Sequence, residues 1–142
     1  MENNKNKRVV IIRGASGSGK STFIKNNLPG AFVCSADDYF VSVLGGGKTY
    51  AFNPRRLGDA HNWCFDAFKQ AITADEPLIV IDNTNIKKAW YEHYVKYAKE
   101  HGYEVFQKCL TGSFKNTHGV SDTAIQKMKS GFEVDAGLPE LT

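Results

Sequence analysis

The 142-residue sequence contains few cysteines and no cysteine pair. Its three cysteines, Cys34, Cys64 and Cys109, are widely spaced, and no Cys-x-x-Cys motif occurs. This spacing argues against a zinc site and against a dense disulfide scaffold, and the odd count is typical of a reducing compartment. The cysteines therefore make a zinc site unexpected.

Long apolar runs are also missing. No stretch approaches the roughly 20 apolar residues that a membrane-spanning helix needs. Residues 1–8 are polar and charged, without the apolar segment of a secretory signal. We therefore expect a cytoplasmic protein without membrane contact, in which residues 1–7 form a flexible tail.

Arginine is scarce, and none follows Arg56. The chain has four arginines against fourteen lysines, and its formal net charge is +3. A charge this small permits nucleic-acid binding but does not indicate it. A hydrophobic content of 42% and a charged content of 23% are ordinary for one globular domain.

One stretch combines a strand pattern with a phosphate-binding motif. Residues 9–12 form a β-branched run, typical of a strand buried on both faces, and Gly-x-x-x-x-Gly-Lys-Ser follows. In such a loop successive backbone N–H groups point at an anion, the lysine reaches the β- and γ-phosphates, and the serine hydroxyl binds Mg²⁺. The motif predicts binding of a nucleoside triphosphate and Mg²⁺ by Gly14, Ala15, Ser16, Gly17, Ser18, Gly19, Lys20, Ser21 and Thr22.

Predicted strands and helices alternate along the chain. We expect strands at 8–13, 31–34, 78–81 and 103–110, helices at 20–27, 54–73 and 87–101, and a last helix beginning near Ser121. Strands separated by helices need crossover connections and therefore pair in parallel. The sequence predicts an α/β fold with one domain at 8–133 and a C-terminal tail at 134–142.

Carboxylates follow two of the predicted strands. Asp37 and Asp38 come after the second strand, and Asp82 ends the third. Ligands of an open α/β sheet bind at the carboxyl ends of its strands, so we expect these residues beside the phosphate loop. Asp82 is a candidate Mg²⁺ ligand and Asp37 a candidate general base, with Asp38 as second candidate base or substrate contact. The alternative for Asp37 and Asp82 is a structural role in a cap or turn.

Other residues carry two interpretations. Arg55 and Arg56 are a solvated pair or a substrate contact, and residues 45–47 are a flexible loop or a segment that closes over substrate. His61 is expected to pack in the apolar stripe of helix 54–73 rather than to serve a site. Trp63 and Trp90 favour packing over base stacking, with Trp90 facing inward. That stripe consists of Leu57, His61, Cys64, Phe68, Ala71 and Ile72.

Four stretches together resemble the small P-loop kinases related to polynucleotide 5′-hydroxyl kinase. They are GASGSGKST, SADDYF, IVIDNTN and KNTHGVSDTAIQKMKSGFE, and the similarity covers roughly residues 8–133. The resemblance implies a P-loop NTPase sandwich with a parallel four-stranded sheet of order 2-3-1-4, helices on both faces and a short lid. It also implies transfer of the γ-phosphate of ATP to a terminal hydroxyl of RNA or DNA, with Asp37 as general base.

The chain differs from that family at three places. Phe40 stands where the family has an arginine thought to contact the substrate phosphate, and the D-T-N aspartate falls at Asn83, one residue after Asp82. The lid has no arginine, and lysine cannot make the bidentate contact that arginine makes. Either Lys115 and His118 supply the positive charge to the transferring phosphate, with Lys127 nearby, or Arg55 and Arg56 reach in.

We therefore predict an ATP- and Mg²⁺-dependent kinase of a nucleic-acid hydroxyl, without an obligate protein partner. Three alternatives remain open: a phage-type kinase of 5-hydroxymethyluracil in DNA, a kinase of a free nucleoside or another small hydroxyl compound, and an ATP-binding regulatory module. Asp37 and Asp38 favour a kinase, because a pure binder needs no base beside the γ-phosphate.

Overall fold

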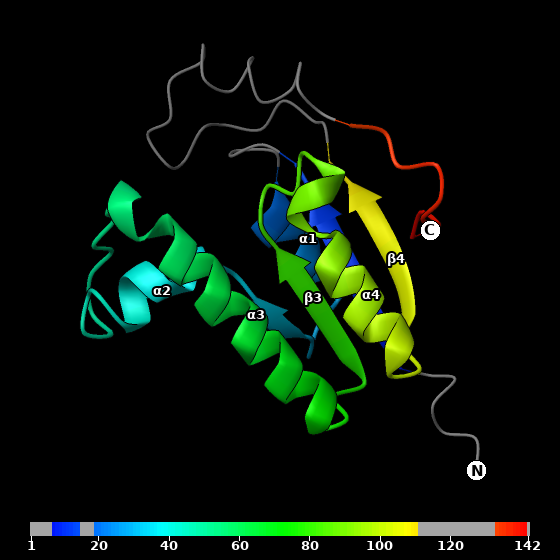
Figure 1. The fold of residues 1–142 in the computed structure, drawn as a ribbon, viewed down its shortest axis with the longest axis horizontal. Helices are drawn as coiled ribbons and strands as arrows, with labels where there is room; N and C mark the ends of the chain where they lie inside the picture. The colour runs from blue at the N-terminus through cyan, green and yellow to red at the C-terminus, as the bar shows by residue number, and fades with distance from the viewer. Residues whose placement is uncertain (1–6, 15–18, 111–132, 142) are drawn as a thin grey trace.

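The computed structural model describes residues 7–14, 19–110 and 133–141, and its centre is one four-stranded sheet (Figure 1). The strands are β1 (Arg8–Arg13), β2 (Phe32–Cys34), β3 (Leu78–Asp82) and β4 (Glu104–Cys109). Their order is β2-β3-β1-β4, and every pairing is parallel. The predicted α/β fold with a parallel sheet of order 2-3-1-4 is confirmed.

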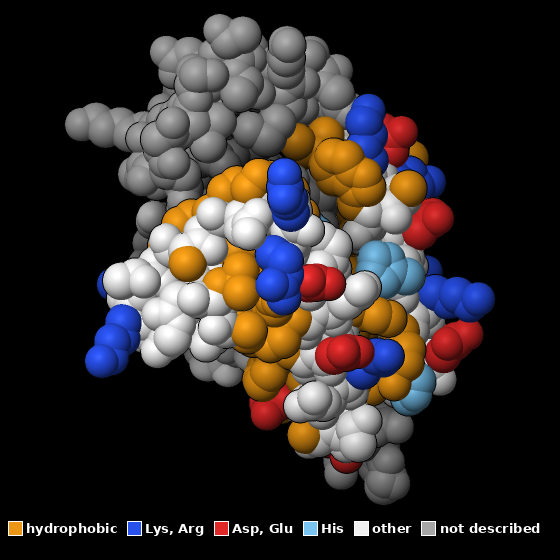
Figure 2. Space-filling view, turned by 60° about the vertical axis from the view of Figure 1, so that its left-hand side comes forward, with side chains coloured by type: hydrophobic (Ala, Val, Ile, Leu, Met, Phe, Trp, Pro, Cys, Tyr) orange, Lys and Arg blue, Asp and Glu red, His pale blue; other side chains and the backbone are white. Residues whose placement is uncertain are grey.

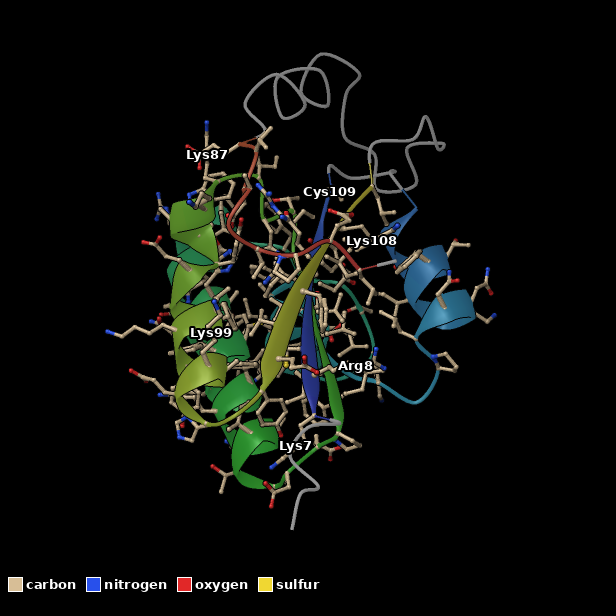
Figure 3. All side chains as sticks on the ribbon, turned by 90° about the vertical axis from the view of Figure 1, so that its right-hand side faces the viewer. Lys7, Arg8, Lys87, Lys99, Lys108 and Cys109 are labelled. Carbon is tan, nitrogen blue, oxygen red and sulfur yellow. The ribbon has the colours of Figure 1, made fainter. Side chains whose placement is uncertain are left out.

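Helices cover both faces of this sheet. The described residues form α1 (Lys20–Asn27), α2 (Asp37–Ser42), α3 (Leu57–Thr73) and α4 (Glu92–Glu100), with short 3₁₀ turns η2 (Pro54–Arg56) and η3 (Lys88–Trp90). Helices α3 and α4 lie on one face and α1 on the other (Figures 1 and 3). Over the described residues, no helix is long and apolar enough to span a membrane.

The side chains of β1 alternate between two hydrophobic clusters. Val9 and Ile11 belong to the cluster that includes residues of α3 and α4, whereas Val10 and Ile12 pack with residues of α1. All four side chains are fully buried, as expected for the central strand of a sheet covered on both faces. The β-branched run therefore places the start of the phosphate loop at the end of a fully buried inner strand.

Two helical regions differ from the prediction. Helix α2 was not predicted, and helix 87–101 is interrupted at Tyr91, so that η3 precedes α4. The Tyr91 side chain is buried, and its hydroxyl donates to Asp135 Oδ2 at 2.7 Å. Trp90 was predicted to face inward, which is wrong, because its side chain is 54% exposed.

The predicted stripe of α3 is confirmed from Cys64 onward, but not at its first two positions. Leu57 and His61 are exposed, so the prediction that His61 packs in the core is wrong. The first turn of this predicted helix is the 3₁₀ turn η2, capped by Asn53, whose side chain accepts from the Arg55 N–H at 3.0 Å. The side chains buried on α3 are Ala60, Cys64, Phe68, Ala71 and Ile72.

The segment predicted to be a tail, 134–142, lies against the carboxyl-terminal half of β4 over the residues described (Figure 3). The Gln107 N–H donates to the Pro139 carbonyl at 2.9 Å, and the Leu141 N–H donates to the Gln107 carbonyl at 2.8 Å. Leu138 is buried in the larger core cluster. This segment therefore covers the outer edge of β4. The predicted lid and the helix from Ser121 lie outside the described residues.

Candidate active site

The carboxyl ends of three neighbouring strands bring predicted site residues to one edge of the sheet. Ile12 of β1 is level with Asp82 of β3, and Cys34 of β2 is level with Ile81. The phosphate loop, Asp82 and the start of α2 therefore follow adjacent strand ends. This register produces the convergence that the order of the strands predicts.

The phosphate loop is fastened where it leaves β1 and where it enters α1. The Gly14 N–H donates to the Thr84 carbonyl at 2.9 Å, and Gly19 adopts a φ of 91°, a left-handed conformation that glycine takes without strain. In the described residues, no acidic side chain or side-chain cap occupies the first turn of α1. The N–H groups and positive dipole end of α1 therefore suit an anion. Residues 15–18 lie outside the described residues.

Lys20 links the phosphate loop to two carboxylates. Its Nζ donates to the Gly14 carbonyl at 3.0 Å. Burial lowers the pKa of Lys20, and the carboxylates of Asp82 and Asp37 act in the opposite direction. Lys20, Asp37 and Asp82 thus interact electrostatically, although they come from three different elements.

Asp37 and Asp38 occupy the first turn of α2 rather than a loop. The Asn83 side-chain oxygen accepts from the Ala36 N–H at 2.9 Å, which ties the start of α2 to the end of β3. Burial, and then the charge of Asp37, raise the pKa of Asp38. Both aspartate side chains remain exposed, so a substrate can reach them.

Three polar side chains at this edge were not recognised in the sequence. The Tyr50 hydroxyl donates to Asp37 Oδ1 at 3.3 Å. Asn83 holds α2 as described, and Asn85 has a left-handed φ of 51° and donates to the Ile12 carbonyl at 2.7 Å. An Asn-x-Asn sequence after a buried strand is a signal for such backbone tethers. No comparable sequence signal identifies Tyr50, because its contact depends on how the preceding loop folds back.

The other predicted substrate residues have different environments. Arg56 donates through Nε to Asp59 Oδ2 at 2.6 Å and through Nη2 to the Tyr39 hydroxyl at 2.7 Å. Arg55 is exposed. His61 lies close enough to Asp37 for that carboxylate to raise its pKa, but desolvation is the larger effect and lowers it. Lys115 and His118 lie outside the described residues.

Ser21 and Asp82 are the residues that could hold Mg²⁺. Ser21 is exposed in the first turn of α1, and Asp82 is half-buried at the end of β3. A hydroxyl and a carboxylate supply the hard oxygen donors that Mg²⁺ prefers, and such sites use one or two protein ligands with phosphates and water. The donor set fits the ion. The described residues contain no group of three or more His, Cys, Asp or Glu that could hold a metal.

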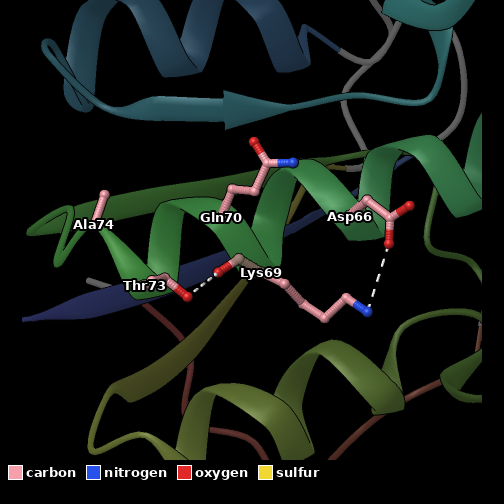
Figure 4. Close-up of a pocket in the computed structure, with 5 residues that line it drawn as sticks. All are labelled: Asp66, Lys69, Gln70, Thr73 and Ala74. Carbon is pink, nitrogen blue, oxygen red and sulfur yellow. Dashed lines mark hydrogen bonds and ion pairs between the residues drawn. The ribbon is translucent and has the colours of Figure 1, made fainter.

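A shallow hollow on α3 lies away from these residues (Figure 4). The hollow is next to the carboxyl end of α3, which leads into the amino end of β3. It therefore lies at the amino ends of the strands, opposite the end that holds the predicted site residues. An ion pair of 3.5 Å joins Lys69 Nζ to Asp66 Oδ1 there. No predicted site residue lines the hollow, which is formed by Asp66, Lys69, Gln70, Thr73 and Ala74.

The sheet order and the phosphate-loop sequence define a P-loop domain of the kinase type. Comparison with known proteins agrees, because a family model described as an AAA domain matches residues 9–110. The chain belongs to this family. A P-loop kinase fold implies the use of ATP and usually of Mg²⁺.

The similar proteins include a human protein and several kinases of known structure. NEDD4-binding protein 2 from Homo sapiens is 33% identical over 143 residues, and the match covers 92% of this chain but 8% of that protein. A sugar kinase from Janibacter sp. HTCC2649 superposes with a TM-score of 0.62 at 16% identity, covering 95% of this chain and 83% of that one. A chain of the Pnkp1/Rnl/Hen1 RNA repair complex gives 0.65 at 16% identity, covering 92% and 46%. The 16% identity of the two solved structures shows that they share the fold of this chain, and no more than that.

Proposed function

We propose that the chain transfers the γ-phosphoryl group of ATP to a hydroxyl of a nucleic acid, most simply a 5′ hydroxyl. The observation that carries the proposal is the position of Asp37, an exposed carboxylate in the first turn of α2, at the same end of the sheet as Lys20 and the start of α1. A carboxylate in this position can act as the general base that takes the proton of an acceptor hydroxyl. Tyr50, which donates to Asp37, would hold that carboxylate in place.

In the proposed reaction, the acceptor oxygen attacks the γ-phosphorus in line with the bond to the β–γ bridging oxygen. A new P–O bond forms, the bridging P–O bond breaks, ADP leaves, and the hydroxyl proton passes to Asp37. Lys20 and the N–H groups at the start of α1 would hold the phosphates. Ser21 and Asp82 would hold Mg²⁺, which neutralises phosphate charge when bound.

The acceptor side is built from Asp38, Arg55 and Arg56 in this proposal. Arg56 is already held by Asp59 and Tyr39, so Arg55 is the better candidate to move toward a phosphate. Lys115 and His118 remain the candidates for the positive charge beside the transferring phosphoryl group. The nucleic-acid acceptor is supported by the four motifs shared with polynucleotide kinases and by the fold similarity to a chain of an RNA repair complex.

A kinase of a small hydroxyl compound is the second candidate. The observation that favours it is the fold similarity to a sugar kinase, which covers more of the other chain than the match to the RNA repair complex does. The two candidates share the ATP site and differ only in the acceptor.

Incubation with γ-labelled ATP, Mg²⁺ and a panel of acceptors distinguishes these candidates. The panel holds 5′-hydroxyl RNA, 5′-hydroxyl DNA, duplex containing hydroxymethyluracil, free nucleosides and sugars. We expect label on a 5′-hydroxyl oligonucleotide. Label confined to nucleosides or sugars would replace the first candidate by the second, and ATP binding without any transfer would favour a regulatory module.

Two substitutions test the roles of the site residues. Lys20→Ala should abolish transfer while leaving the circular dichroism spectrum intact, because the triphosphate loses its cation. Asp37→Asn should lower kcat by about 10²–10⁴-fold with little change in ATP affinity, because Asp37 acts on the acceptor. An equal loss of ATP affinity in Asp37→Asn would reassign this residue to nucleotide or metal binding.

A further inference from the structure

We propose that Tyr50 and Phe52 form a stacking platform for an unpaired base at the terminal nucleotide of the acceptor. This inference rests on the proposed function, since it names how a nucleic-acid acceptor is held beside Asp37. The observation behind it is a pair of exposed aromatic rings fixed next to the candidate base.

The rings are exposed and nearly parallel. The Tyr50 side chain is 55% exposed and that of Phe52 is 50% exposed. Their planes differ by 13°, and their centroids are 6.2 Å apart. Both rings pack on Phe40, which is fully buried, with centroids 6.0 Å away for Tyr50 and 5.0 Å away for Phe52. A surface pre-formed in this way loses little side-chain entropy when a base stacks on it.

The segment that carries these rings is a built turn. The Ala51 N–H donates to the Phe40 carbonyl at 2.9 Å, and the Gly47 N–H donates to the Val41 carbonyl at 2.8 Å. A Cβ atom at Gly45 would lie 1.7 Å from the Thr49 carbonyl oxygen, so only glycine permits this close approach. Backbone contacts therefore fold the chain back on α2 and place both rings.

One ring of the platform is hydrogen-bonded to Asp37, the candidate general base. The Tyr50 hydroxyl donates to Asp37 Oδ1 at 3.3 Å, so the edge of its ring is beside the carboxylate. The 5′ hydroxyl that would present its hydrogen to Asp37 is one or two bonds from the sugar ring of the first nucleotide. A nucleobase stacked on Tyr50 would therefore belong to the terminal nucleotide rather than to the interior of the strand.

The charges around the platform suit a polyanion. Lys48 precedes the two rings and Arg55 follows them, and both side chains are exposed. On this face of the molecule, hydrophobic side chains are exposed among lysine and arginine side chains, with acidic groups close by (Figure 2). Aromatic rings flanked by basic side chains are the usual composition of sites that bind single-stranded nucleic acid.

The test measures transfer to a 5′-hydroxyl single-stranded oligonucleotide with an intact or an abasic terminal nucleotide. The oligonucleotide is varied at saturating ATP, and ATP is varied separately at a fixed high oligonucleotide concentration. The variants are Phe52→Ala, Tyr50→Phe and, at the distant hollow of α3, Gln70→Ala. Binding of the same fluorescently labelled oligonucleotides is measured in parallel by anisotropy, which does not depend on transfer.

We expect Phe52→Ala to raise the KM and the Kd for the intact oligonucleotide about tenfold or more, with the KM for ATP unchanged. For the wild-type chain, the abasic oligonucleotide should have a KM and a Kd raised by a similar factor. With the abasic oligonucleotide, Phe52→Ala should change neither constant. Tyr50→Phe keeps the ring and should keep the oligonucleotide KM within about twofold, while lowering kcat because Asp37 loses its donor. Gln70→Ala should change neither constant.

Two results would overturn the platform. One is an equal effect of Phe52→Ala on intact and abasic ends in binding and transfer. The other is a rise in the KM for ATP, which would assign the rings to the adenine instead. If the wild-type chain transfers no label to any oligonucleotide, the proposed function fails, and oligonucleotide binding that ignores the terminal base would overturn the platform separately.

Discussion

Arg13 connects the end of β1 to the segment after β3, to β4 and to Glu133 through one buried side chain. Its guanidinium donates to the carbonyls of Asn85 at 2.8 Å and Ile86 at 2.9 Å, to Gln107 Oε1 at 3.0 Å, and to the Glu133 carbonyl. The side chain is fully buried at the end of β1, next to Gly14. Arginine suits this place because its planar group presents several donors in fixed directions.

Replacing Arg13 should strongly destabilise the fold. Arg13→Ala leaves buried carbonyl groups without their donor, so we expect the free energy of unfolding to fall by about 3–5 kcal/mol. Urea denaturation measures the change. The exposed Lys99→Ala should stay within about 0.5 kcal/mol of the wild type. A loss below about 1 kcal/mol for Arg13→Ala would mean that water replaces the guanidinium.

Asp38 should make stability depend on pH. Its pKa is raised in the folded state by burial and by Asp37, so the folded chain binds more protons than the unfolded chain just above pH 3.8. Stability is therefore lost as pH rises through that window, and the cost persists at neutral pH. Asp38→Asn should stabilise the chain at pH 7 but not at pH 3, which is below the unfolded-state pKa. The gain in the free energy of unfolding should be less than about 1 kcal/mol because the group is partly exposed, and melting temperatures at the two pH values detect it. A gain of equal size at both pH values would rule out titration.

At the scale of elements, the turn between α2 and η2 depends on one glycine. Gly45→Ala should destabilise the chain by about 1–3 kcal/mol, because the added methyl group meets the carbonyl oxygens of Thr49 and Phe40. Gly58 in α3 is the matched control, since nothing lies within 4 Å of its added Cβ. Gly58→Ala should stabilise the helix by about 0.5–1 kcal/mol. Thermal unfolding of the two variants compares them, and similar shifts would contradict the steric argument.

Local sequence patterns predicted the elements whose stability is local or whose burial is complete. The bounds predicted for β1 and α1 agree with the observed ones. A continuous β-branched run is typical of a buried strand, and the phosphate-loop motif requires a strand before it and a helix after it. His61 and Trp90 were placed wrongly: His61 lies in the first part of α3, before the buried stripe begins at Cys64 apart from Ala60, and Trp90 lies in the 3₁₀ turn η3 rather than in a continuous helix. The convergence of Asp37 and Asp82 followed from topology, whereas the Tyr50 contact follows from a loop path that no residue pattern specifies.

At the scale of the whole molecule, the two outermost strands of the sheet, β2 and β4, differ in length and in what lies beside them. β2 is an edge strand of three residues, with Phe32 and Val33 each 37% exposed. The other edge, along β4, is covered by the C-terminal segment. Short strands and covered edges both limit pairing with other chains.

Deleting 134–142 should therefore destabilise the chain and promote association. The deletion removes Leu138 from the core and uncovers β4, so we expect a loss of several kcal/mol, on the order of 2–5 for Leu138 alone. Size-exclusion chromatography should detect oligomers of the truncated chain. Leu138→Ala is the control, which should lose stability while remaining monomeric. A monomeric truncated chain would show that the open edge of β4 does not pair.

The residues on either side of 111–132 are anchored at one point. The Leu110 N–H donates to the Arg13 carbonyl at 2.8 Å, and the Glu133 carbonyl accepts from the Arg13 guanidinium. The entropy of closing a loop rises by only about 0.6 kcal/mol for each doubling of its length. Because both anchors are on Arg13, a change in the number of residues between Leu110 and Glu133 should cost little in closure entropy.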